Sequence, residues 1–322
     1  MKQEQIKELE QTIGKDYSNI AGIVVRKNGE TLYEKYFNGY TADAAFHVFS
    51  VTKSITSALI GMAIGQGYIG DIGQKVLEYF PDYTPKRGEK MAQNVTIKDM
   101  LTMTAPFKYK SAPYTKYFSS ESWVKSALDL LGGKGKIGEF RYTPLIGPDI
   151  LTGILMNATE EPVLDFANTH LFSPMGIEAA QSVVFHSKEE QLNLMKDYHR
   201  CGWVNDPQGV ATAAWGLFMK PTDMAKIGQL YLNGGEWEGR QLVSAEWIKE
   251  STTVHSRWEE MNLSYGYLWW IIDADSYAAI GDGGNVIYVN TKKKLVVAIA
   301  SLLARKVKDR VEFIKKVIEP IV

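Results

Sequence analysis

Residues 46–62 read FHVFSVTKSITSALIGM, a largely apolar segment that carries a serine and a lysine three positions apart. The segment predicts a helix that starts near Ser50. On such a helix Ser50 and Lys53 project from the same face, about one turn apart. A serine hydroxyl becomes a nucleophile when a base removes its proton, and a lysine amine serves as that base when burial lowers its pKa. The apolar neighbours favour this desolvation, and the helix N-terminus favours negative charge developing beside Ser50.

The same spacing also fits an ordinary helix start, in which the serine caps the helix and the lysine faces solvent. The rest of the chain decides between the two interpretations. Strand-like segments lie at both ends. Residues 21–37 contain Asn28-Gly29, the strongest short signal for a hairpin, because a type I′ turn needs positive φ at both central residues. An isolated hairpin is marginally stable, so we expect one mostly antiparallel sheet that also contains the C-terminal segments Tyr265–Ile272, Tyr277–Ile280, Val286–Asn290 and Leu295–Ser301.

The middle of the chain has a helical pattern. Thr96, Ser120, Thr222 and Ser244 each stand where an N-cap hydroxyl is expected. The predicted fold class is therefore α/β, in the α+β sense: an antiparallel sheet from the N- and C-terminal segments (1–49 and 205–322), flanked by helices, and an all-helical subdomain (50–204). The expected helices are Val51–Gln66, Ile97–Met103, Glu121–Leu131, Asp149–Asn157, Val163–Leu171, Asp223–Leu232, Ala245–Ser251 and Val307–Ile318.

Composition excludes several classes of protein. The chain has 322 residues, with 36 Lys plus Arg against 37 Asp plus Glu, so no strong field attracts nucleic acid or anionic lipid. Cys201 is the sole cysteine, which rules out an intramolecular disulfide and a multi-cysteine zinc site. The first 17 residues are charged and helix-prone, and no apolar run of 18 residues occurs. We therefore expect a cytoplasmic protein with no membrane partner and a small-molecule substrate.

Eight segments of the chain, taken in order, resemble the penicillin-recognising serine hydrolases, the β-lactamase-related family. The likeness is to the branch that contains class C β-lactamases, family VIII esterases and nylon-oligomer hydrolases. It implies a β-lactamase-like fold with the active site at the seam between the sheet and the helical subdomain. The segments are FSVTKSITSALIG, GYIGDIGQKVLEYFPDY, VTIKDMLTMT, FRYTPLIG, FANTHLFSPMGI, PTDMAKIGQLYLNGGEWEGRQLVSAEW, YGYLWW and IGDGGNVIYV.

The resemblance implies roles for three residues. Ser50 matches the nucleophile that forms the acyl intermediate, and Lys53 matches its base partner. Tyr142 matches a tyrosine that relays a proton, although Pro144 stands where the family usually has asparagine. A phenol beside amine or ammonium groups is expected to ionise below its usual pKa of about 10. The alternative is that Tyr142 only packs.

The third family element is a strand reading Lys-Thr-Gly or His-x-Gly, which corresponds here to Gly281-Asp282-Gly283-Gly284-Asn285. The family's cation is missing, so recognition of a penicillin carboxylate is not expected. The resemblance implies that the Gly284 N–H joins the Ser50 N–H in an oxyanion hole, and that Asp282, Gly283 and Asn285 contact substrate. Asp282 either points away from the cleft or selects a cationic substrate. The plain alternative for this segment is a hairpin turn before Val286.

Trp203 and Trp215 flank a stretch that the resemblance places near the mouth of the cleft, where they would form an apolar wall for an acyl group. Other motifs fit less well. The string at 133–138 satisfies a dinucleotide fingerprint, but it follows a helical run and is interpreted as a loop. The five histidines have no metal-binding spacing, so no metal or cofactor is expected, and His47 is expected to pack.

The sequence therefore predicts a serine hydrolase that cleaves a small ester or amide, rather than a true β-lactam, through an acyl-Ser50 intermediate. Two alternatives stay open. One is a binding or sensing protein of the same fold that turns over poorly, suggested by Pro144 and the missing cation. The other is an amidase or peptidase acting on D-amino-acid derivatives.

Overall fold

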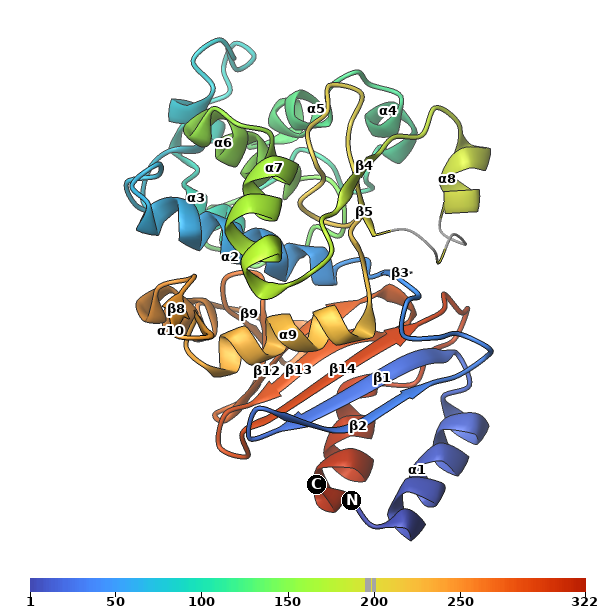
Figure 1. Cartoon of the computed structure of the whole chain (residues 1–322). Coiled ribbons are helices and arrows are strands. Elements are labelled where there is room, and N and C mark those ends of the chain that lie inside the picture. Colours follow the sequence, from blue (N-terminus) through green and yellow to red (C-terminus); the bar gives the residue numbers. More distant parts are fainter. Residues whose placement is uncertain (195–197, 199–200) are drawn as a thin grey trace.

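An eight-stranded antiparallel sheet, built from both ends of the chain, organises the structure (Figure 1). The computed structural model describes residues 1–194, 198 and 201–322. The strand order is β2-β1-β14-β13-β12-β11-β10-β9, so the N-terminal hairpin pairs directly with the last strand, with Ile23 opposite Ile299. This confirms the predicted sheet. Its strands are β1 (Ile20–Lys27), β2 (Glu30–Tyr36), β9 (Ser256–Trp258), β10 (Leu263–Tyr265), β11 (Trp270–Asp273), β12 (Ser276–Gly281), β13 (Asn285–Asn290) and β14 (Leu295–Ser301).

Both faces of the sheet are covered, which explains why its central strands are apolar on both sides. Along β1, Ile23 and Val25 join one hydrophobic cluster, and Ala21 and Val24 join the other. Helix α1 and the C-terminal helix α11 cover the first face, and α9 lies between the opposite face and the helical region (Figure 1). The helices are α1 (Gln3–Asp16), α2 (Val51–Gly65), α3 (Ile97–Leu101), α4 (Tyr114–Phe118), α5 (Trp123–Leu130), α6 (Asp149–Thr159), α7 (Val163–Ala167), α8 (Lys188–Leu194), α9 (Pro221–Leu232), α10 (Ala245–Ser251) and α11 (Arg310–Phe313).

Three further strand pairs are short. The pair β3–β6 is antiparallel and lies directly before α2, where it fixes the start of that helix. Helix α2 is buried along almost its whole length, including its polar residues Thr52, Lys53, Ser54, Thr56 and Ser57. Within the described ranges, no helix combines the length and the apolar character needed to span a membrane. The short pairs are β3 (Phe46–His47) with β6 (Phe218–Met219), β4 (Gln181–Val183) with β5 (Gly202–Val204), and β7 (Glu236–Trp237) with β8 (Arg240–Gln241).

One predicted strand was wrong. The segment Tyr265–Ile272 is not continuous, because β10 ends at Tyr265 and β11 begins at Trp270. In the intervening turn, Leu268 has a positive φ of 61°, its N–H donates to Leu101 O, and its carbonyl accepts from the Ser54 hydroxyl. These contacts with α2 and α3 tie the turn to the helical region, and such long-range contacts override local strand propensity.

Two of the four predicted N-caps were also wrong. Thr96 and Ser244 accept from backbone N–H groups at the starts of α3 and α10, as predicted. The cap of α5 is Ser122 rather than Ser120, since its side chain accepts from Lys125 N. Helix α9 begins at Pro221, before Thr222, because proline at the first helical position has a suitable φ and lacks the N–H that would be unpaired there.

Candidate active site

Ser50 lies at the junction between β3 and α2, where the chain turns sharply. The Val48 N–H donates to Leu217 O, which fixes the approach to this turn. Phe49 has a φ of 50°, a left-handed conformation that is uncommon for a bulky residue and that recurs at functional sites. Ser50 then precedes the first residue of α2, and Lys53 follows one turn later with its Nζ 2.9 Å from Ser50 Oγ. The predicted serine–lysine pair is therefore in direct contact.

The Lys53 amine has three hydrogen-bond acceptors around it: Ser50 Oγ at 2.9 Å, Pro144 O at 2.7 Å and Ala214 O at 3.0 Å. Its side chain is buried. Burial lowers the pKa of Lys53 to about 7, and the negative charges of Asp149 and Asp282 oppose this shift. In the neutral form the two remaining N–H bonds can point at the two carbonyls, which leaves the nitrogen lone pair directed at the Ser50 hydroxyl.

Pro144 occupies the position at which the family resemblance predicts asparagine. The side chain of proline offers no hydrogen bond, but its backbone carbonyl lies 2.7 Å from Lys53 Nζ. One of the acceptors around the lysine thus comes from the main chain. The substitution removes a polar side chain that could contact substrate, and it leaves the lysine fully hydrogen bonded.

Tyr142 lies beside Lys53, with its ring centroid 5.2 Å from Lys53 Nζ. The ring packs against the indoles of Trp258 and Trp270, which come from β9 and β11. The sheet therefore holds the phenol against the serine–lysine pair. The three residues predicted to act together are brought to one place from α2 and from the loop that precedes α6.

The expected direction of the Tyr142 pKa shift was wrong. The pKa of Tyr142 is raised to about 12, because burial and, to a smaller extent, the charge of Asp282 outweigh the lowering by the interaction with the Ser50 hydroxyl. The negative charge of Asp282 disfavours the phenolate form of Tyr142. Tyr142 is thus protonated at neutral pH and can donate a proton to a leaving group or to Lys53.

A small cavity of about 120 Å³ opens beside Ser50. Trp215 and Asp282, two residues that the sequence predicted to contact substrate, line it. Trp215 is 3% exposed and packs against Phe118 and His47. Burial lowers the pKa of His47 to about 3, so this ring is neutral and serves as packing. The remaining lining residues are Phe49, Phe118, Leu145 and Gln191.

Trp203 does not line this cavity. It is fully buried, and its Nε1–H donates to Thr212 O, which places it in the core behind the cavity. The apolar wall suggested by the sequence therefore comes from Trp215 together with phenylalanines that the sequence did not single out.

The backbone of Gly281, the last residue of β12, adjoins the serine. A Cβ added there would lie 2.1 Å from Val48 O and 3.2 Å from Ser50 N, so only glycine fits. No hydrogen bond formed within the described part of the chain uses the Ser50 N–H. This N–H, together with the backbone after Gly281, borders the space in which an oxyanion would form.

The role of the Gly284 N–H in an oxyanion hole stays a prediction, because the direction of a Cβ does not determine that of the N–H. A Cβ on Gly284 would meet Arg310 and Val307, on the side of the turn away from Ser50. Gly283 faces Leu302, and its carbonyl accepts from the Asn19 side chain. The positive φ values of 78° and 91° at these glycines serve the turn itself, as in the hairpin alternative for this segment.

Asn285 is also not exposed to the cavity, although it was predicted to contact substrate. It is fully buried, and its Nδ2 donates to Asp282 O at 2.7 Å and to His47 O at 3.4 Å. Its Oδ1 accepts from the Ser301 N–H. Asn285 thus ties the turn to β3 and β14 and positions it beside Ser50.

Asp149, the first residue of α6, is a buried acid near the site that the sequence did not single out. Its carboxylate accepts from Ala213 N at 2.7 Å and Ala214 N at 3.4 Å, and from the Tyr117 hydroxyl. Burial raises the pKa of Asp149 to about 6. Asp149 thereby positions the segment that contains Ala214, and the carbonyl of Ala214 accepts a hydrogen bond from Lys53. An acid at a helix start also suits the helix dipole, so the sequence signal alone points to no special role.

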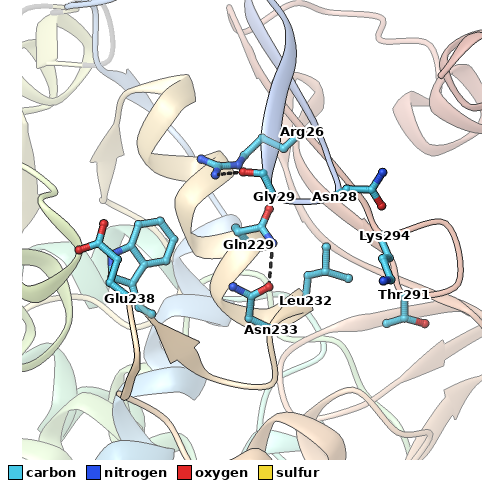
Figure 2. A pocket seen from close by; sticks show the side chains of 10 residues that line it. Arg26, Asn28, Gly29, Gln229, Leu232, Asn233, Glu238, Thr291 and Lys294 are labelled. Carbon is cyan, nitrogen blue, oxygen red and sulfur yellow. Dashed lines mark hydrogen bonds between the residues drawn. The ribbon is translucent and has the colours of Figure 1, made fainter.

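A larger cavity, of about 530 Å³, lies near the C-terminal end of α9 (Figure 2). It is lined by Arg26 and Gly29 from the β1–β2 hairpin, Gln229 and Asn233 near the end of α9, and Lys294 before β14. It shares no lining residue with the cavity at Ser50 and holds no serine or cysteine. In the described part of the chain, no three metal-ligating side chains gather closely enough to hold an ion.

Comparisons with known proteins agree with this geometry. The family model described as Beta-lactamase matches residues 8–313. The 6-aminohexanoate-dimer hydrolase of Paenarthrobacter ureafaciens is 22% identical over 246 residues, 73% of this chain and 57% of that protein, so the match spans little more than half of the relative.

Solved structures share the fold at low identity. A family VIII carboxylesterase superposes with a TM-score of 0.71 at 16% identity, covering 95% of this chain and 92% of that chain. A penicillin-binding protein homologue from Caulobacter crescentus superposes with a TM-score of 0.71 at 15% identity, covering 93% and 91% of the two chains.

Proposed function

Because the chain belongs to the beta-lactamase family, we propose that it is a serine hydrolase that cleaves a small ester or amide through an acyl-Ser50 intermediate. The observation that carries the proposal is the buried Lys53 amine 2.9 Å from Ser50 Oγ, with two backbone carbonyls taking its other hydrogen bonds. This arrangement favours a neutral lysine whose lone pair faces the hydroxyl.

In the first half-reaction Lys53 accepts the Ser50 proton while Oγ bonds to the substrate carbonyl carbon. The carbonyl oxygen becomes an oxyanion, which accepts from the Ser50 N–H and, we infer, from the N–H of Asp282, the residue after Gly281. The bond to the leaving alcohol or amine then breaks, and the leaving group takes a proton from Tyr142, which regains one from protonated Lys53. Tyr142 is suited to this role because its raised pKa keeps it protonated.

In the second half-reaction water attacks the acyl carbon. Lys53, neutral again, accepts a proton from the water, the acyl–Oγ bond breaks and Ser50 is reprotonated. The acid leaves, and the site returns to its starting state. The proton lost by Ser50 leaves with the alcohol or amine in the first half-reaction, and the attacking water supplies its replacement in the second.

The size of the cavity limits the acyl group. About 120 Å³ lined by Phe49, Phe118, Leu145 and Trp215 suits a short chain rather than a bulky one. The names of the similar proteins, a 6-aminohexanoate-dimer hydrolase and a carboxylesterase, support amides and esters as the substrate class. The family's cation is missing from the segment 281–285, and the acidic Asp282 lines the cavity, so recognition of a penicillin carboxylate is not favoured.

The experiment compares wild type with Ser50→Ala, using a fluorophosphonate probe and a 4-nitrophenyl ester of a short fatty acid. Wild type is expected to be labelled at Ser50, and Ser50→Ala is expected to lose label and to lower kcat/KM by about 10⁴- to 10⁶-fold. Ser54→Ala is the matched control. Its hydroxyl lies in the same helix and donates to Leu268 O, away from the cavity.

Three outcomes would count against the proposal. Label retained in Ser50→Ala would place the nucleophile elsewhere. Equal loss in Ser54→Ala would point to damage to α2 rather than to loss of a nucleophile. A folded wild type that neither takes the probe nor turns over any short ester or amide would favour the alternative of a binding protein.

A further inference from the structure

Asp282 places a negative charge at the edge of the catalytic cavity. Asp282 lines the cavity together with Ser50, and it follows Gly281, which adjoins the Ser50 N–H. Its charge raises the pKa of both Lys53 and Tyr142, so its field reaches both proton-transfer groups. No ion pair formed among the described residues uses this carboxylate.

A carboxylate in this position destabilises the oxyanion that forms from a neutral substrate. The reaction develops negative charge on the carbonyl oxygen, in a site whose purpose is to stabilise that charge. A fixed negative charge nearby raises the energy of the oxyanion, and the effect is larger in a partly desolvated cavity than in water. A substrate that brings its own positive charge would reverse the sign of the interaction.

The other walls of the cavity suit such a substrate. Trp215, Phe118 and Phe49 are aromatic, and aromatic faces attract cations. Gln191 provides an uncharged polar group at the mouth. An acidic group beside aromatic rings is a combination that recognises ammonium groups, and the small volume limits the spacer between the ammonium and the acyl carbon to a few atoms.

We propose that Asp282 selects substrates whose acyl part carries an ammonium group on a short chain, that is, short aminoacyl esters or amides. The proposal rests on the acyl-Ser50 function above and names its substrate class. The ammonium group pairs with the Asp282 carboxylate and lies beside Trp215, while the acyl carbon faces Ser50 Oγ. A neutral substrate of the same shape still fits but leaves the carboxylate uncompensated.

The test uses two 4-nitrophenyl esters of nearly equal size, 4-aminobutyryl and pentanoyl, which differ in an ammonium group against a methyl group. Wild type is expected to have a kcat/KM about 10- to 100-fold higher for the aminobutyryl ester, after the spontaneous release of 4-nitrophenol from each ester, by hydrolysis or by lactam formation, is subtracted. Asp282→Asn is expected to abolish this preference, mainly through a lower kcat/KM for the charged ester. Raising the salt concentration is expected to weaken the wild-type preference.

Asp275→Asn is the matched control. Asp275 immediately precedes β12, at the opposite end of the strand that ends at Gly281, so this variant loses an equal charge far from the cavity. It is expected to keep the wild-type preference. If Asp275→Asn and Asp282→Asn changed the preference equally, a general charge effect would replace the proposed contact.

The pentanoyl ester separates failure of this inference from failure of the proposed function. Turnover of that ester by wild type and its loss in Ser50→Ala would leave the acyl-serine function standing. Equal kcat/KM values for the two esters, or a preference that survives in Asp282→Asn, would then overturn the role of Asp282 alone.

Discussion

Gly281 and Gly284 lie three residues apart in the turn between β12 and β13, yet they face opposite sides of it. A Cβ on Gly281 would meet the backbone around Ser50, and a Cβ on Gly284 would meet the side chains of Arg310 and Val307. Gly281 is extended, with a φ of −125°, and Gly284 has a φ of 91°. One glycine is therefore needed for close approach to the nucleophile, and the other for the shape of the turn.

The side of the turn away from Ser50 is held by residues from both ends of the chain. Asn19 donates to Gly283 O and to Leu302 O, each at 2.7 Å, and accepts from Arg310. Arg310 also lies over the Tyr17 ring. This support is made of hydrogen bonds and packing, so its loss should reduce stability, whereas damage to the Gly281 side should reduce catalysis.

Gly281→Ala is expected to have the largest effect. The new Cβ would lie 2.1 Å from Val48 O, and since this oxygen belongs to the backbone and cannot rotate away, the strand and the start of α2 must separate. The Ser50 N–H and the backbone after Gly281 would then no longer point at a common oxyanion, which lowers kcat by about 10²- to 10³-fold. The measurement is ester turnover, with circular dichroism and the thermal midpoint as controls for folding. An active Gly281→Ala enzyme would show that this backbone does not bind the oxyanion.

The next prediction is the pH dependence of activity, which tests the side of the turn that faces Ser50. Lys53 must be neutral to accept the Ser50 proton, and its pKa is about 7, so activity should rise about tenfold from pH 6 to pH 8. Because the charge of Asp282 raises this pKa, Asp282→Asn should move the rise to lower pH. The measurement is kcat/KM for a neutral ester across this range. A rate that falls as the pH increases would contradict Lys53 as the base.

Sequence reasoning predicted the parts of the fold and site that depend on local spacing. The contact between Ser50 and Lys53 follows from their separation of three residues at the start of one helix. The N-terminal hairpin follows from Asn28-Gly29, which has the expected positive φ values of 53° and 86°. The sheet followed from strand signals at both ends, because a hairpin needs partners.

The rest depends on contacts between distant segments. The backbone carbonyl of Pro144 accepts a hydrogen bond from Lys53. Because every residue has such a carbonyl, the residue type does not indicate this contact. Asp149 acts through the backbone of Ala213 and Ala214, far along the chain. In the Gly-Asp-Gly-Gly segment, the residue types do not indicate which glycine faces Ser50. The contacts that Asn19 and Arg310 make with the turn decide this.

Gly284→Ala is expected to have the smallest effect on activity, and it tests whether this glycine serves the shape of the turn. A φ of 91° is unfavourable for alanine, and the new Cβ would lie 2.8 Å from Arg310 Nε. Strain and displacement of Arg310 should lower the free energy of unfolding by about 1–3 kcal/mol. Turnover per folded molecule should stay within about threefold of wild type, because the side chain of residue 284 faces away from Ser50. A denaturant titration and ester turnover on the same sample measure both quantities. Activity lost with stability intact would place Gly284 in the catalytic site and remove the distinction between the two sides of the turn.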